Sequence, residues 1–153
     1  MTLQRREIVW DHLRPLFDLK VAVGQEGQVA PNEITLAQQP YDPASYVWGL
    51  WDGETLVGLL GMIHPLESDE MEDGDDYGAA YIWRLMIGAD HQGKGYGRKA
   101  IALAGEVATE WGLPRICLTF VDKAGGAEGF YLKCGFQRTG RIDDGELEMV
   151  RDV

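Results

Sequence analysis

The chain has 153 residues, of which 45% are hydrophobic, so we expect one domain over residues 1–153 with its own buried core. Its formal net charge of −11 at pH 7 argues against binding to nucleic acid, because an acidic protein repels phosphates. No apolar run reaches membrane-spanning length and the first residues lack an export signal, so we expect a cytoplasmic protein without membrane contact.

The first third of the sequence predicts a weak strand and two short helices. The strand covers Leu3 to Ile8, and the first helix covers Asp11 to Lys20, with Pro15 in its first turn, where a missing N–H costs little. After a loop rich in Gly, Gln, Pro and Asn, the second helix is expected through Gln38, with Asn32 as its cap.

A hairpin and a strongly acidic segment follow. Asp52-Gly53 separates predicted strands at Tyr46–Trp51 and Thr55–Ile63, and this dipeptide is typical of a tight hairpin turn. The acidic segment, residues 67–76, holds seven carboxylates and no cation. Such a run usually forms a solvated, mobile loop.

The remaining sequence alternates between strand and helix patterns. We expect these elements in the order strand Tyr77–Ile87, glycine loop, helix to Trp111, strand Arg115–Val121, helix Ala127–Cys134, and strands 136–142 and 146–151 around the turn Asp144-Gly145. An antiparallel hairpin followed by this alternation predicts a mixed α/β sheet with helices packed against it.

The glycine loop, residues 92–98, is the strongest functional signal. Its sequence Gln-Gly-Lys-Gly-Tyr-Gly-Arg lies between a strand and a helix N-terminus, where backbone N–H groups and the helix dipole favour an anion. Lys94, Arg98 and Lys99 add three cations in an otherwise acidic protein, which favours a phosphate-bearing ligand. The spacing is neither that of a Rossmann loop nor that of a Walker A loop, and a glycine turn that binds nothing is the structural alternative.

Two motifs carry a resemblance to a known family. Gln92-x-x-Gly95-x-Gly97 matches the Gln/Arg-x-x-Gly-x-Gly/Ala signature of the GNAT N-acetyltransferases, and Gly129 to Phe136 resembles the family's Phe-Tyr-x-x-x-Gly-Phe segment. The resemblance implies a GNAT fold of the α/β (α+β) class, with a mixed, mostly antiparallel central sheet of about six to seven strands flanked by helices. It also implies acetyl-CoA as co-substrate and no metal.

The same resemblance assigns roles on the donor side. The loop would hold the pyrophosphate of acetyl-CoA, and backbone groups of the preceding strand would pair with pantetheine. The residues concerned are Leu85, Met86, Ile87, Gln92, Gly93, Lys94, Gly95, Tyr96, Gly97 and Arg98. Tyr131 matches the tyrosine that protonates the departing thiolate, while simple packing beside Phe130 is the alternative. Many members have Asn seven residues before this tyrosine, where Ala124 stands here.

The acceptor is expected to be a polyamine. Residues 57–61, the acidic segment, residues 83–87 and the stretches 29–32 and 36–38 resemble the bacterial spermine/spermidine and diamine acetyltransferases. Those substrates are polycations, which carboxylates attract and aromatic rings can face. The expected contacts are Glu67, Asp69, Glu70 and Trp83, with Glu72, Asp73, Trp48, Trp51 and Tyr81 as further candidates.

Other assignments stay open at this level. No general base stands out, because His64 is expected to cap or lie at the surface and His91 to face solvent. Cys117 and Cys134 lack metal-like spacing and are expected to be reduced core residues. The alternatives are an acetyltransferase for an amino acid, an aminoglycoside or a protein N-terminus, or a non-catalytic acyl-CoA-binding module. The family also implies a possible homodimer.

Overall fold

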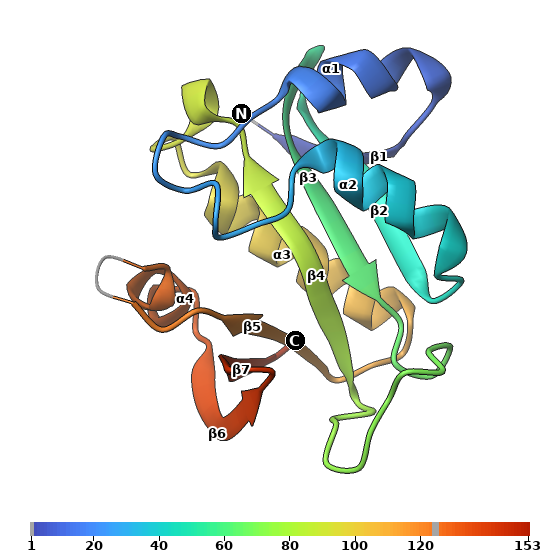
Figure 1. The fold of residues 1–153 in the computed structure, drawn as a ribbon, viewed down its shortest axis with the longest axis vertical. Coiled ribbons are helices and arrows are strands. Elements are labelled where there is room, and N and C mark those ends of the chain that lie inside the picture. The colour runs from blue at the N-terminus through green and yellow to red at the C-terminus, as the bar shows by residue number, and fades with distance from the viewer. Residues whose placement is uncertain (1, 124–125) are drawn as a thin grey trace.

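The structure is a computed structural model that describes residues 2–123 and 126–153. In chain order the strands and helices are β1 (Leu3–Glu7), α1 (Leu13–Asp18), α2 (Asn32–Gln38), β2 (Ser45–Asp52), β3 (Thr55–Ile63), β4 (Ala79–Ile87), α3 (Tyr96–Glu110), β5 (Arg115–Phe120), α4 (Glu128–Lys133), β6 (Gln137–Asp143) and β7 (Glu146–Asp152). Short 3-10 turns cover Trp10–His12, Gln39–Tyr41 and Ala89–His91. Figure 1 shows their arrangement.

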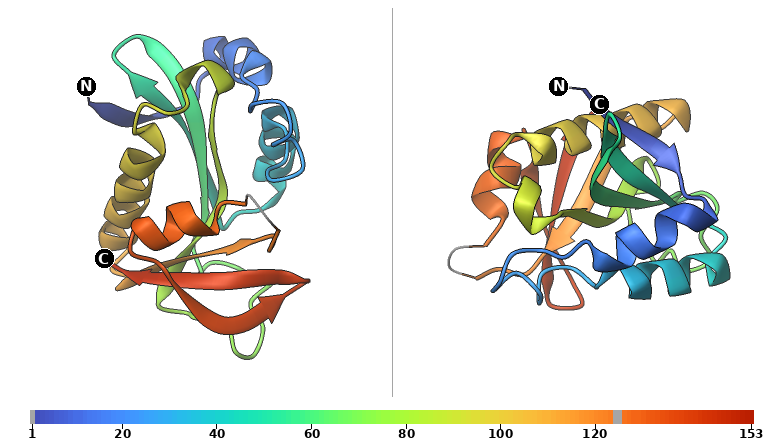
Figure 2. Two further views of the ribbon diagram at one scale, coloured as in Figure 1. Left: turned by 90° about the vertical axis from the view of Figure 1, so that its left-hand side faces the viewer. Right: turned by 90° about the horizontal axis from the view of Figure 1, so that it is seen from above.

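One mixed sheet of seven strands in the order β1-β2-β3-β4-β5-β7-β6 organises the described residues. Neighbouring strands are antiparallel except β4 and β5, which are parallel. Helix α3 covers one face of the sheet, and α1 and α2 cover the other (Figures 1 and 2). The predicted mixed, mostly antiparallel sheet flanked by helices is therefore confirmed.

The main core lies between α3 and the sheet. Ala100, Ile101, Ala104 and Val107 recur at helical spacing and are fully buried against strand residues such as Leu60 and Ile116, which explains why this stretch forms a helix. A smaller cluster of Leu16, Leu59 and Met86 anchors α1 to the opposite face. None of the helices in the described part of the chain combines the length and apolarity that crossing a bilayer requires.

The N-terminal helices match their expected positions, but the expected cap was wrong. Pro31 is the N-cap of α2, and Asn32 is already inside the helix. The buried Asn32 amide instead donates to Leu16 O at 2.9 Å and Leu19 O at 3.3 Å. Asn32 thus satisfies the last carbonyls of α1 and ties the two helices together.

The contact between β4 and β5 is short, and this determines where the site lies. The two strands pair only from Ala79↔Arg115 to Tyr81↔Cys117, and beyond that point they diverge into a fork. On its other side β4 remains paired with β3 up to Gly58↔Ile87, with a register shift that leaves Trp83 as an extra residue on β4. Backbone groups of β4 that face the fork therefore have no strand partner there.

Candidate active site

The glycine loop leads from the end of β4 into α3. Gly93 and Gly95 have φ of 74° and 87°, in the left-handed region that glycine tolerates best. Gly95 is the N-cap of α3, and the first hydrogen bond of the helix runs from Lys99 N–H to Gly95 O at 3.3 Å. The N–H groups of the first turn consequently have no acceptor within the helix and offer donors to an anion.

Position 97 requires glycine because the Phe130 ring packs closely against it, not because of its backbone φ. A Cβ at this position would lie 3.0 Å from Phe130 Cζ and 3.4 Å from Phe130 Cε1, tighter than ordinary van der Waals contact. The absence of a side chain lets α4 pack directly against the first turn of α3. The glycine loop and the aromatic segment of α4 therefore form one wall.

Side chains on either side of the loop hold it in place. Gln92 Nε2 donates to Ile87 O and to Gln25 Oε1, each at 2.9 Å. Tyr96 is buried, and its hydroxyl donates to Asp52 Oδ2 at 2.5 Å, a bond that raises the pKa of the phenol. Gln92 and Tyr96 thus position the loop through their side chains, which leaves only their backbone groups for a ligand.

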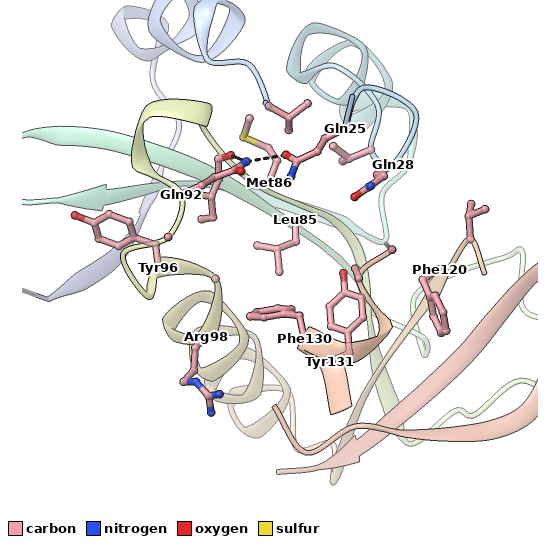
Figure 3. A pocket seen from close by; sticks show the side chains of 18 of the residues that line it. Gln25, Gln28, Leu85, Met86, Gln92, Tyr96, Arg98, Phe120, Phe130 and Tyr131 are labelled. Carbon is pink, nitrogen blue, oxygen red and sulfur yellow. Dashed lines mark hydrogen bonds between the residues drawn. The ribbon is translucent and has the colours of Figure 1, made fainter. Parts of the chain in front are cut away.

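A pocket with a volume of about 490 Å³ opens between the glycine loop and the fork, and we call it the glycine-loop pocket. Figure 3 shows it from close by. It is lined by Val21, Gln25, Gln28, Val29, Leu85, Met86, Ile87, His91, Gln92, Gly93, Gly95, Tyr96, Gly97, Arg98, Thr119, Phe120, Val121, Lys123, Gly126, Ala127, Phe130 and Tyr131. Every residue predicted for the donor side is among them except Lys94, which is exposed.

Tyr131 lies in this pocket inside a cluster of aromatic rings. Its ring centroid is 5.4 Å from that of Phe130, 5.8 Å from Phe136 and 6.4 Å from Phe120. The hydroxyl points into the pocket (Figure 3). Burial raises the pKa of the phenol, with smaller contributions from Cys134 and Tyr81. The phenol therefore stays protonated at neutral pH and can act as a proton donor.

A second pocket, of about 240 Å³, lies below the fork, and we call it the acidic pocket. Its walls are Asp42, Ile63, Pro65, Ser68, Glu70, Met71, Asp75, Asp76, Ala79, Tyr81, Trp83, Cys117, Thr119, Asp143 and Glu148. Six of these residues are carboxylates. Thr119 lines both pockets, and its Oγ1 lies 2.9 Å from the Tyr81 hydroxyl, so a hydrogen bond between side chains spans the gap at the base of the fork.

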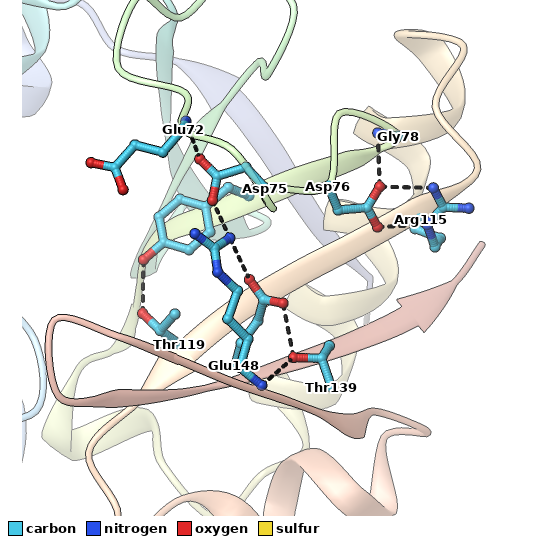
Figure 4. A network of polar contacts seen from close by, with 10 residues as sticks. Glu72, Asp75, Asp76, Gly78, Arg115, Thr119, Thr139 and Glu148 are labelled. Carbon is cyan, nitrogen blue, oxygen red and sulfur yellow. Dashed lines mark hydrogen bonds and ion pairs between the residues drawn. The ribbon is translucent and has the colours of Figure 1, made fainter.

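Two carboxylates of the acidic segment are neutralised by arginines from distant strands. Asp76 accepts two hydrogen bonds from Arg115, at 2.7 and 2.8 Å, and another from Gly78 N–H at 2.9 Å. Asp75 pairs with Arg141 and accepts from Glu72 N–H at 2.7 Å (Figure 4). The end of the segment is therefore fastened to β5 and β6, and the expectation of a uniformly solvated loop was wrong for these two residues.

The residues predicted to contact the acceptor do not all lie together. Glu70 and Trp83 line the acidic pocket, with the Arg84 guanidinium 4.5 Å from the centre of the Trp83 ring. Glu67 instead accepts a 2.6 Å hydrogen bond from the Tyr46 hydroxyl, and Asp69 is exposed and lines neither pocket.

The other aromatic candidates divide in the same way. Tyr81 lines the acidic pocket. Trp48 and Trp51 line neither pocket, and their rings face Arg5 and Arg6, whose guanidinium carbons lie 4.9 and 5.3 Å from the ring centres. These two indoles thus interact with cations of this chain.

The two histidines considered as general bases, His64 and His91, differ in their surroundings. His64 stacks on Trp111 with ring centroids 4.6 Å apart, and its Nδ1 accepts from Leu66 N–H at 3.3 Å, which confirms a structural role. His91 is half-buried and lines the glycine-loop pocket, so the expectation that it faces solvent was wrong. Ala124, where the resembled family often has Asn, lies outside the described residues.

Cysteine and metal chemistry find no support among the described residues. Cys117 and Cys134 are free and buried, as expected, and burial raises the pKa of the Cys117 thiol to about 12. Within residues 2–123 and 126–153, no group of three or more His, Cys, Asp or Glu side chains is placed to hold a metal ion.

Comparison with known proteins gives one family. The sequence profile described as the acetyltransferase (GNAT) family matches residues 8–136. No curated protein sequence matches the chain.

Several solved structures have a similar fold over nearly the full chain. An acetyltransferase from Thermus thermophilus has 21% identity and a TM-score of 0.74, covering 100% of this chain and 98% of that one. A spermidine N-acetyltransferase from Vibrio cholerae, in complex with CoA and spermine, has 21% identity and a TM-score of 0.72, covering 99% and 95%. A Bacillus subtilis acetyltransferase in complex with CoA has 15% identity and a TM-score of 0.68, covering 99% and 98%. At these identities the similarity shows a shared fold.

Proposed function

The chain belongs to the GNAT family of acetyltransferases and is thus an acetyl-CoA-dependent N-acetyltransferase, and we propose that its acceptor is a polyamine such as spermine or spermidine. One observation supports this acceptor above all. The glycine-loop pocket, which contains Tyr131, and the acidic pocket, which contains Glu70 and Trp83, share Thr119 as a common wall. A donor and a cationic acceptor can therefore approach the same point from different sides.

The glycine-loop pocket suits the donor. Open space beside Gly93 and Gly95, together with the unpaired N–H groups of the first turn of α3, fits a pyrophosphate, and Arg98 adds a cation at the rim. The unpaired backbone of Leu85 to Ile87 in the fork fits the amide groups of a pantetheine arm. Bound acetyl-CoA supplies an acetyl group activated as a thioester.

Tyr131 is our proposed proton donor to the sulfur. Its hydroxyl points into the glycine-loop pocket, and burial keeps the phenol protonated at neutral pH. A thiolate that leaves into an apolar pocket needs a proton, and a phenol that shares this pocket can donate it. The rings of Phe120, Phe130 and Phe136 pack around the phenol and help to fix its orientation.

The acidic pocket suits a cation on an alkyl chain. Carboxylates attract ammonium groups, and the rings of Tyr81 and Trp83 provide faces for the methylene stem and for a second charge. A substrate with several ammonium groups gains from both the pocket and the exposed carboxylates of the acidic segment. The Vibrio cholerae spermidine N-acetyltransferase, which shares the fold, makes a polyamine the first substrate class to test.

A panel of amines tests the proposal. Thiol release from acetyl-CoA is followed with spermine, spermidine, diamines, an amino acid with an uncharged side chain, an aminoglycoside and a peptide with a free N-terminus. We expect kcat/KM to rise with the number of ammonium groups on a flexible chain, and this preference to weaken as salt is added. A higher kcat/KM for the amino acid or the peptide would overturn the polyamine acceptor but not the family.

A further inference from the structure

We propose that Glu148 on β7 is the carboxylate that removes a proton from the acceptor amine, an inference that rests on the proposed function. A primary ammonium has a pKa of about 10 and is almost fully protonated at pH 7, so the nitrogen must lose a proton before it can attack a carbonyl carbon. The glycine loop and Tyr131 provide no group for this task, and none of the three histidines lines the acidic pocket.

Strand register puts Glu148 beside Thr119, the residue that both pockets share. Thr119 on β5 and Glu148 on β7 lie directly opposite each other in an antiparallel pair. Side chains of directly opposed residues project from the same face of a sheet. Because Thr119 lines both pockets, the neighbouring Glu148 lies where an amine in the acidic pocket comes closest to the fork.

The two carboxylate oxygens of Glu148 differ in their partners. Oε1 accepts a 2.9 Å hydrogen bond from the Thr139 hydroxyl, which fixes the side chain (Figure 4). Among the described residues no group donates a hydrogen bond to Oε2, which forms a long ion pair with Arg141 Nη1 at 3.8 Å. The side chain is only 14% exposed. This mostly buried carboxylate therefore has one oxygen fixed by Thr139 and the other without a hydrogen-bond donor.

The other carboxylates of the acidic pocket are less suitable. Asp75 and Asp76 are held by Arg141 and Arg115, and these arginines help to lower the pKa of both carboxyl groups. Asp42 precedes β2, whereas Glu148 lies on the strand directly opposite Thr119. Glu70 and Asp143 are exposed, so packing fixes their side chains less than that of Glu148. These two carboxylates fit the attraction of the cation better than the removal of its proton.

The proton balance is complete with Glu148 and Tyr131. The ammonium gives one proton to Glu148, which passes it to solvent. The neutral nitrogen forms a bond to the acetyl carbon as the carbon–sulfur bond breaks, and Tyr131 gives its proton to the sulfur. The nitrogen releases its second proton as the amide forms, and this proton restores the phenol. One acetamide, one thiol and one released proton result.

Three of the groups around Glu148 keep one protonation state at neutral pH. Burial raises the pKa of Tyr81 and of Cys117, so both stay neutral, and the hydrogen bond to Asp75 keeps Arg141 cationic. The other neighbours are carboxylates and the Thr119 hydroxyl. The groups that face Glu148 or lie on the same face of the sheet are Arg141, Asp75, Asp143, Glu146, Tyr81, Thr119 and Cys117.

The decisive experiment measures kcat/KM for spermidine as a function of pH in the wild type and in Glu148→Gln. The substitution keeps the oxygen that Thr139 contacts and removes the proton acceptor. We expect a loss of about 10²-fold or more at pH 7. The variant should recover about tenfold per pH unit toward pH 10, because only the neutral fraction of the amine can then react. The KM for acetyl-CoA should not change.

The matched control is Glu146→Gln, which removes the same charge from the same strand two residues away and lines neither pocket. We expect its pH profile to follow the wild type. Three outcomes would overturn the inference. The kcat/KM of Glu148→Gln could fall equally at all pH values, or fall less than threefold. Alternatively, the pH-dependent fall could occur in Glu146→Gln instead. If the wild type releases no thiol with any amine, the proposed function fails, whatever the variant does.

A second variant covers the case in which Glu148→Gln does not fold. Thr139 is exposed, and Thr139→Val removes the hydrogen bond that orients Glu148 without removing the carboxylate. We expect a fall in kcat of about threefold to tenfold with the wild-type pH profile, and unchanged binding of acetyl-CoA by calorimetry. An unchanged kcat would count against the role of Glu148.

Discussion

The two pockets are built in different ways, although they share Thr119. The glycine-loop pocket relies on backbone: unpaired N–H groups after Gly95 and the unpaired edge of β4 from Leu85 to Ile87. The acidic pocket relies on side chains from β4, β5, β7 and the loop between β3 and β4. The binding groups of a backbone site suit one class of ligand, and one short stretch of sequence provides them. A side-chain site can change its ligand through single substitutions anywhere around its wall.

The largest expected effect tests the chemical role of the glycine-loop pocket. Tyr131→Phe removes the hydroxyl and keeps the ring that packs on Phe130 and Phe136. We expect kcat to fall by about 10²–10⁴-fold because the sulfur loses its proton donor. Binding of acetyl-CoA, measured by calorimetry, should stay the same. An unaltered kcat would reduce Tyr131 to a packing residue.

The next largest effect tests whether the glycine-loop pocket depends on Gly97 having no side chain. Gly97→Ala would bring a Cβ to 3.0 Å from Phe130 Cζ, and the ring would have to move into the pocket. We expect the KM for acetyl-CoA to rise about tenfold, equivalent to about 1.4 kcal/mol.

Gly105→Ala in the same helix is the control, since its Cβ would meet only Val153 Cγ1 at 3.5 Å. It should raise helix stability by about 0.5–1 kcal/mol without changing that KM. Equal KM values in the two variants would show that Gly97 matters only for helix formation.

A smaller effect separates the acceptor side from the donor side. Glu70→Gln removes one exposed carboxylate of the acidic pocket. An exposed charge pair contributes about 0.2–1 kcal/mol, so the KM for spermidine should rise by a factor of about 1.4 to 5, less at high salt, while the KM for acetyl-CoA stays constant.

Glu106→Gln on the exposed face of α3 makes the same change in net charge and lines neither pocket. A similar rise in both variants would point to the net charge of the protein rather than to the pocket.

The smallest effect concerns how the acidic segment is fastened. The hydrogen bonds from Arg115 lower the pKa of Asp76, so the pair stabilises the fold above the unfolded value of 3.8 and loses this contribution as the pH falls through the lower folded value. Both side chains are about one-third exposed, so Asp76→Asn should cost about 1 kcal/mol or less at neutral pH. Urea unfolding should show this difference at pH 7 and its disappearance below the folded pKa. Asp73→Asn, at an exposed neighbouring position, should cost nothing at either pH.

The difference between the backbone-built pocket and the side-chain-built pocket also explains which features could be predicted from the sequence. The hairpin around Asp52-Gly53, the strand ending at Ile87 and the helix after Gly95 follow from local turn chemistry and periodicity, and all three lie within a few residues of their expected bounds. The resemblance of two short motifs was sufficient to predict residues that lie together in the glycine-loop pocket.

The acidic pocket depends on long-range geometry. Six residue pairs from Arg115↔Asp152 to Phe120↔Leu147 join β5 to β7, with Thr119 opposite Glu148 among them, and no local pattern reveals this register. Arg115 and Arg141, which neutralise two acidic residues, are likewise 39 and 66 positions away from their partners. Asn32 has the residue type of a cap, yet it is buried and bonds to a different helix. The single domain, the homodimer and the cytoplasmic location stay predictions.

The fork also has a mechanical consequence. Backbone pairing connects the sheet half β1–β4 to the half β5–β7 only between Ala79 and Tyr81, so the ladder resists little force pulling the halves apart. Besides the hydrogen bonds of Tyr81 with Thr119 and of Arg115 with Asp76, cohesion across this joint comes from the shared core, where Ile116, Phe136 and Met149 pack in the same cluster as residues of α3. A substitution that shortens one of these side chains and leaves a cavity would therefore weaken the attachment of the whole half β5–β7, although it removes no residue pair of the sheet. We expect amide hydrogen exchange to become faster across β5–β7 together.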